Sequence, residues 1–144
     1  MSLKTRLNGN LKIIFLIIAI LLIFFSLRAD VTTARLGKQD FRLEKANTQQ
    51  KEEAGLSGRQ SLGKYHGMIF QNNGDSDMCM WMKDMRFDLA MIWVDGSDKV
   101  TYIEPHLTSA SYPKTFCHPG DQVIEVNPTD QEASGLKVGD QLLL

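Results

Sequence analysis

The segment DMCMWMKDM, residues 77–85, places a lysine and an aspartate in an apolar part of the chain. Lys83 and Asp84 follow methionines, a tryptophan and a cysteine. A charged side chain left unpaired in an apolar interior is costly in free energy. We therefore expect either that both charges are paired inside a core or that they face a pocket and act there.

Other charged residues lie inside or beside apolar segments in the same way. One interpretation is a set of ion pairs that fixes strand register, and the other is a binding pocket. On an extended strand Trp81 and Lys83 would project from the same face, with an aromatic wall next to a cationic donor. This combination suits a ligand with an apolar or ring-shaped part and a carboxylate or phosphate. The candidate ligand-binding residues are Arg59, Trp81, Lys83, Asp84, Asp88 and Glu125.

Catalysis is the alternative to ligand binding at these residues. Lys83 would act as a base and a nearby carboxylate would orient it. The sequence has no readable Ser-His-Asp or Cys-His arrangement, and its three histidines lack the spacing of a metal site. We therefore expect no metal and no cofactor, and we expect the methionines to fill the core.

The chain has two cysteines, Cys79 and Cys117. An even number of cysteines in an oxidising compartment predicts one disulfide. It would join the apolar segment to the proline-containing stretch 105–122. Two free, buried thiols are the alternative.

The N-terminus holds an almost uninterrupted apolar run, with Lys4, Arg6 and Lys12 before it. Its length predicts a transmembrane signal-anchor helix at residues 11–28, and the basic residues place residues 1–10 in the cytoplasm. A cleaved secretory signal is the alternative, although the residues after the run suit a cleavage site poorly. The predicted location is thus the cell membrane, as a single-pass protein with its domain outside.

Residues 31–144 are typical of short strands separated by turns. Residues 89–94 are apolar at every position, which favours a central strand covered on both faces. Thr48 or Asn47 can cap a short helix that stops at Gly55. The predicted fold is mainly β: a compact antiparallel domain, like a barrel or sandwich, with one or two short helices, preceded by the transmembrane helix.

Several motifs resemble those of the bacterial and archaeal domain-of-unknown-function family 192. In the family's order over residues 31–144, they are GLSGRQSL, HGMIF, CMWMKDM, DLAMIWVD, KVTYIEP, VIEVN and SGLKVGDQLLL. The positions that carry the resemblance are Arg59, Leu62, Gly67, Met68, Phe70, Trp81, Met82, Lys83, Asp88, Asp95, Glu125, Gly135, Gly139 and Asp140. Asp84 and Met85 replace the family's usual Asn-Thr, and Phe87 replaces its proline. The resemblance implies a compact, mostly antiparallel β domain with minor helices, and no established activity.

A formal net charge of −1 gives no reason to expect nucleic acid as a partner. The predicted function is a membrane-anchored extracytoplasmic domain that binds a small ligand or an envelope partner. The membrane itself is a predicted partner through the N-terminal helix. The alternative is an enzyme that acts on an extracytoplasmic substrate, with Lys83 and a nearby carboxylate in its site.

Overall fold

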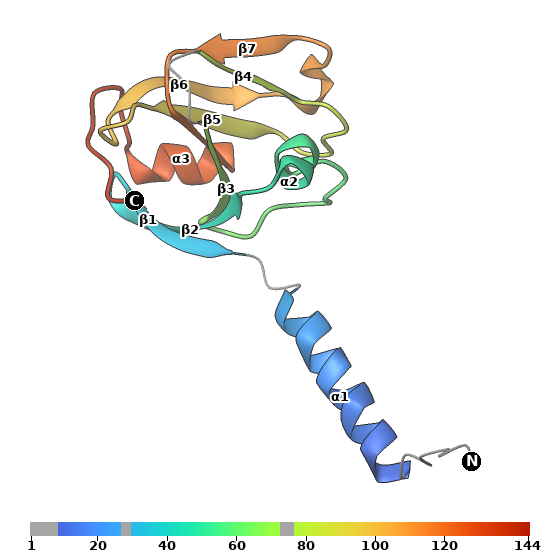
Figure 1. Ribbon diagram of the computed structural model, residues 1–144. Coiled ribbons are helices and arrows are strands. Elements are labelled where there is room, and N and C mark those ends of the chain that lie inside the picture. The colour runs from blue at the N-terminus through green and yellow to red at the C-terminus, as the bar shows by residue number, and fades with distance from the viewer. Residues whose placement is uncertain (1–8, 27–29, 73–76) are drawn as a thin grey trace.

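The computed structural model describes residues 9–26, 30–72 and 77–144, which form a helix and a mainly β domain (Figure 1). Helix α1 (Gly9–Ser26) has 18 residues. At about 1.5 Å per residue it is about 27 Å long, less than a hydrocarbon core of about 30 Å. Within the described residues, no helix combines the length and apolar character that crossing a membrane requires.

The predictions of a transmembrane helix at residues 11–28 and of the membrane as a partner are therefore wrong. The predicted single-pass location in the cell membrane, with the domain outside, is wrong for the same reason. Residues 1–8, which make up most of the predicted cytoplasmic terminus, lie outside the described residues. Residues 27–28, at the end of the predicted span, also lie outside them.

Six strands form one mixed sheet in the order β1-β2-β3-β8-β5-β6. Their bounds are β1 (Val31–Leu36), β2 (Gln39–Ala46), β3 (His66–Gln71), β5 (Leu89–Val94), β6 (Val100–Leu107) and β8 (Gln122–Val126). Strands β2 and β3 are parallel, and all other neighbours are antiparallel. A parallel pair needs a crossover connection, which residues 47–65 provide with helix α2 (Gln49–Ala54).

The predicted antiparallel barrel or sandwich is wrong in two respects. One pair of strands is parallel, and the sheet is open, with β1 and β6 as its edge strands. The C-terminal residues reach both ends of the sheet only through isolated bridges, from Leu143 to Arg35 and from Gln141 to Lys99. The mainly β composition agrees with the prediction, as do the short helices α2 and α3 (Pro128–Ser134).

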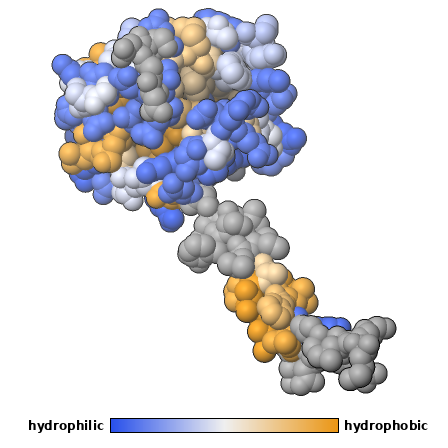
Figure 2. All heavy atoms as spheres, viewed as in Figure 1, coloured by the Kyte–Doolittle hydropathy of each residue, from blue (hydrophilic) through white to orange (hydrophobic). Residues whose placement is uncertain are grey.

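Apolar side chains bury both faces of the sheet. Strand β5 is buried at all six positions, as its uniformly apolar sequence predicts. Successive side chains of a strand point to opposite faces, so Ile124 of β8 packs with Ile92 on one face. Val123 packs with Trp93 on the other face. In Figure 2 the visible surface of the domain is mainly hydrophilic, whereas the described part of α1 is hydrophobic and exposed.

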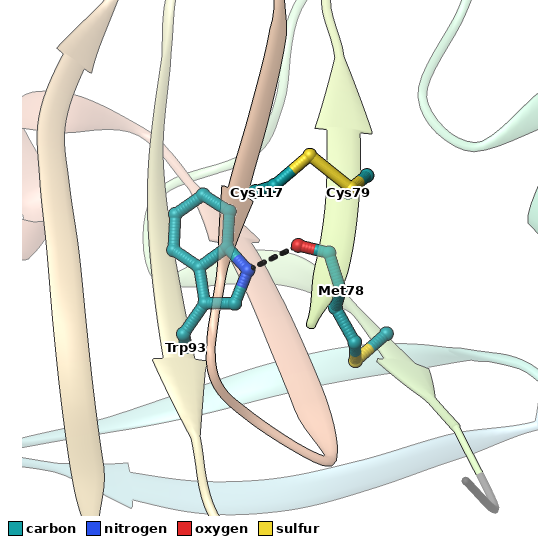
Figure 3. The surroundings of a disulfide bond; sticks show 4 residues. All are labelled: Met78, Cys79, Trp93 and Cys117. Atoms are coloured by element: carbon teal, nitrogen blue, oxygen red, sulfur yellow. Dashed lines mark hydrogen bonds between the residues drawn. A yellow bond between two sulfur atoms is a disulfide. The ribbon is translucent and has the colours of Figure 1, made fainter. Parts of the chain in front are cut away.

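A two-stranded antiparallel ribbon covers the sheet face that carries Trp93. It consists of β4 (Met78–Trp81) and β7 (Thr115–His118). The indole Nε1 of Trp93 donates a hydrogen bond of 2.8 Å to the backbone carbonyl of Met78 (Figure 3). The ring of His118 stacks on Tyr102 of β6, with 3.6 Å between ring centroids. These contacts dock both strands of the ribbon on the sheet.

Cys79 and Cys117 are direct partners in the ribbon and are joined by a disulfide with an S–S distance of 2.07 Å (Figure 3). The structure thus contains the disulfide that the sequence predicts. The apolar segment around Cys79 does not join the main sheet, because β4 belongs to the separate ribbon. Cys79 and Trp81 are exposed.

Strands β3 and β8 are in close contact at Gly67. A Cβ atom at this position would collide with the backbone carbonyl of Glu125. It would also lie 2.8 Å from side-chain carbons of both Leu43 and Val126. Only a glycine fits here without a shift of β8.

Replacing both Cys79 and Cys117 with serine should lower the free energy of unfolding by about 3–4 kcal/mol. The disulfide closes a ring with a sequence separation of 38, which restricts the unfolded chain. The fold should persist, because the Trp93 hydrogen bond still anchors the ribbon. Guanidinium denaturation of the oxidised protein and the double variant measures the difference, and a loss of less than about 1 kcal/mol would contradict this prediction.

Gly67→Ala should destabilise the protein by about 1–3 kcal/mol, because the added methyl group must displace the backbone of β8. Gly63→Ala is the matched control. Its Cβ would meet only the ring of His66, at 3.0 Å and beyond, and this exposed side chain can move. Equal losses of stability in the two variants, measured by thermal and chemical denaturation, would show that the close contact at Gly67 is unimportant.

Candidate functional site

A cleft of about 360 Å³ lies between α2, the end of β3 and strand β4. This volume is within the range of small-molecule sites, about 300–1,000 Å³. The larger apolar side chains that line it are Leu56, Phe70, Met78, Met80, Trp81 and Met85. The ribbon therefore forms one wall of the cleft, and α2 with its following loop forms another.

Local sequence signals set the position of α2. The Thr48 hydroxyl caps the helix by accepting a hydrogen bond of 3.3 Å from the backbone N–H of Lys51. Gly55 ends the helix with a φ of +50°, a conformation that glycine adopts readily. The cap at Thr48 and the stop at Gly55 are those that the sequence predicts.

The loop after α2 is tied to the turn after β4. The hydroxyl of Ser57 donates a hydrogen bond of 2.8 Å to the backbone carbonyl of Lys83. The backbone N–H of Gly58 donates one of 3.0 Å to the carbonyl of Asp84. These two bonds join the walls of the cleft at one end.

Glu125 lies at the floor of the cleft, on the central strand β8. Its neighbours across the ladder are Met68 and Met91, and its side chain shares the sheet face of Val123. Only 4% of Glu125 is exposed, and its carboxyl group has no hydrogen bond or ion pair with any of the described residues. Burial raises the pKa of this carboxyl to about 8. At neutral pH it is therefore mostly protonated and can donate a hydrogen bond into the cleft.

Trp81 forms part of the outer wall, at the end of β4, and is 44% exposed. Of the six predicted ligand-binding residues, the structure brings only Trp81 and Glu125 together at the cleft. Sequence reasoning missed Phe70 and the methionines as lining residues, because it assigned the methionines to the core. The sequence did contain a signal for the methionines of β4. Residues 78–81 have the length of a strand and are apolar on both faces, so one face could have been assigned to a cleft.

Lys83 and Asp84 occupy an exposed turn that follows β4. Strand β4 ends at Trp81, so the expectation that Lys83 shares its strand face is wrong. Lys83 takes part in none of the ion pairs among the described residues, contrary to the expected pairing with a carboxylate. The chain tolerates these charges because the apolar segment turns outward after buried Met82.

Arg59 and Asp88 are paired with other side chains away from the cleft. Arg59 donates two hydrogen bonds, of 2.7 and 2.8 Å, to the carboxylate of Glu44. This interaction lowers the pKa of Glu44 and raises the pKa of Arg59. Asp88 is hydrogen-bonded to His106 Nε2 at 2.8 Å, which holds the pKa of Asp88 below its usual value. For Arg59 and Asp88, the interpretation as structural pairs therefore fits better than the interpretation as ligand-binding residues.

No group of three or more His, Cys, Asp or Glu side chains within the described ranges has the arrangement of a metal site. The cleft itself offers carboxyl, amide and thioether groups. Its chemistry is therefore that of hydrogen bonding, apolar contact and charge.

The model of the family DUF192, described as "Uncharacterized ACR", matches residues 31–144. The chain belongs to this family. The residues matched include both walls of the cleft and its floor.

Two solved structures are similar to this chain. A candidate transcription regulator from Sinorhizobium meliloti 1021 has a TM-score of 0.73 and 22% sequence identity, over 81% of this chain and 95% of that one. A protein of unknown function from Novosphingobium aromaticivorans DSM 12444 has a TM-score of 0.70 and 26% identity, over 79% and 85%. No curated protein matches the chain.

The raised pKa of Glu125 predicts that stability decreases with pH. The folded state holds the proton more tightly than the unfolded state, whose pKa is near 4.5. The contribution of this proton to the free energy of unfolding is complete below about pH 4.5. It is lost as the pH rises to about 8, by up to about 1.4 kcal/mol per pH unit. Compared with the wild type, Glu125→Gln should therefore gain relative stability over this interval and show no further gain above it.

Glu44→Gln is the control of opposite sign, because the pKa of Glu44 is lowered. The wild type should lose its advantage over this variant as the pH falls. Urea denaturation at a series of pH values measures both differences. A constant difference between wild type and Glu125→Gln from pH 5 to pH 8 would rule out the buried acid as the cause.

Proposed function

We propose that this domain binds a small organic molecule in the cleft between α2 and the ribbon. The observation that carries the proposal is Glu125, a buried carboxyl group that lines a cavity with aromatic and methionine side chains and has no hydrogen bond or ion pair with any of the described residues. Taking a carboxyl group out of water costs free energy unless another polar group replaces the lost hydrogen bonds. A ligand that hydrogen-bonds to Glu125 recovers part of this cost.

The walls favour a ligand with an apolar or aromatic part. Trp81 and Phe70 offer large ring surfaces, and their faces suit stacking against another ring. Met78, Met80 and Met85 have flexible, polarisable side chains that adapt to different shapes. A few polar groups in a mostly apolar cleft are the usual composition of a small-molecule site.

Binding is favoured over catalysis because the residues proposed for catalysis do not meet in the cleft. Lys83 is absent from the described lining residues, and its carbonyl, not its ammonium group, contacts the cleft residue Ser57. The Sinorhizobium protein is named as a transcription regulator, but we do not propose that function for this chain. At 22% identity that likeness concerns the fold alone.

The test uses neutral aromatic probes, indole and 2-phenylethanol, titrated into the ¹⁵N-labelled full chain. Chemical-shift changes should cluster at residues of β4, α2 and the end of β3. Ala54→Trp, at an exposed position on the cleft wall, should fill the cleft and weaken binding by about tenfold or more.

Ala110→Trp is the matched control, because Ala110 is exposed in the 3-10 helix Ser109–Ser111 and does not line the cleft. It should leave binding unchanged. Shift changes scattered over the surface, or equal affinities in the two tryptophan variants, would overturn the proposal.

A further inference from the structure

The charged side chains that line the cleft are all acidic. They are Glu52 and Glu53 of α2 and Glu125 of β8. Lysine, arginine and histidine are missing from the described lining residues. Lys51, also on α2, is directed to another contact, because its ammonium group donates a hydrogen bond of 2.8 Å to Asn47.

Among the described residues, the surroundings of Glu125 contain no counter-charge. The neighbouring strands contribute Met68 and Phe70 from β3 and Met91 from β5, and the ribbon contributes Met78 and Met80. In the described part of the chain, the other ionisable groups of the cleft are thus Glu52 and Glu53 on α2. Both are exposed carboxyl groups.

We propose that the ligand is an organic ammonium ion, with a protonated amine that pairs with Glu125 and an apolar or aromatic part that lies against Trp81 and Phe70. This inference rests on the proposed function, since it assigns the ligand class of the same cleft. It replaces the carboxylate- or phosphate-bearing ligand that the pairing of Trp81 with Lys83 suggested.

Each class of ligand meets a different electrostatic environment. An anion would face the carboxylates of Glu52 and Glu53 without a compensating cation among the described lining residues, which is repulsive. A neutral molecule can accept one hydrogen bond from protonated Glu125. A cation converts the buried acid into an ion pair and gains further attraction from the faces of aromatic rings.

Binding of an ammonium ion is linked to release of a proton. In the free protein near pH 7, the carboxyl group of Glu125 is mostly protonated because it is buried. The ammonium ion pairs with the carboxylate form, so the O–H proton of Glu125 leaves to the solvent while the amine keeps its own proton. Affinity should therefore rise by up to about tenfold per pH unit below pH 8 and level off above it.

The experiment compares three probes of matched shape: 2-phenylethylamine, 2-phenylethanol and 3-phenylpropanoate. Affinities are measured by NMR titration of the full chain at pH 6, 7 and 8, where an aliphatic amine with a pKa of about 10 remains protonated. The amine should bind at least about tenfold more tightly than the alcohol at pH 8, and the acid should bind most weakly. The preference for the amine should increase with pH.

Two variants identify the carboxyl group responsible. Glu125→Gln should abolish both the preference for the amine and its pH dependence while the alcohol still binds. Glu132→Gln makes the same substitution at an exposed position on α3, outside the cleft. It should leave all three affinities unchanged.

The outcomes separate the two proposals. If the alcohol binds in the cleft but the amine binds no more tightly at pH 8, the ammonium inference fails and the binding cleft stands. Retention of the preference for the amine in Glu125→Gln also overturns the inference. If none of the three probes shifts the cleft resonances, both proposals are overturned.

Discussion

Strand β8 pairs with β3 on one side and with β5 on the other, so it joins the two halves of the sheet. The position of β8 between β3 and β5 depends on close contact with β3. At Gly67 of β3 there is no space for a side chain against the backbone of Glu125. This arrangement also places Glu125 between buried Met68 and Met91, on a strand that is paired on both sides. The position of the acid is thus fixed by the pairing of β8 with its two neighbours.

The ribbon completes the site from the other side. Its hydrogen bond from Trp93, the stacking of His118 on Tyr102 and the disulfide hold two short strands that lie outside the main sheet. Without the ribbon, the face around Trp93 would be uncovered and Glu125 would be accessible to water. The same contacts therefore bury the apolar face and create the environment that raises the pKa of the acid.

Local patterns in the sequence predicted the elements whose causes are local. These include strand β5, the capped helix α2 and a mainly β domain. The disulfide was also predicted, from the number of cysteines. The parallel pairing of β2 with β3, and the separation of β4 from the sheet, depend on partners distant in sequence, and no local period reveals them. For the same reason, sequence reasoning named Glu125 and Trp81, which the structure places at the cleft, but it did not identify Glu44 as the partner of Arg59.

The two walls of the cleft differ in local stability. Helix α2 has six residues and buries none of them, and a helix this short has little stability of its own. The opposite wall is covalently closed at Cys79 and Cys117. Amide hydrogens of α2 should therefore exchange with solvent through small local openings, whereas those of the ribbon face a higher barrier. For a ligand in the proposed site, the range of accepted molecular sizes would then be set by the movement of α2, and the discrimination of stereochemistry by the ribbon.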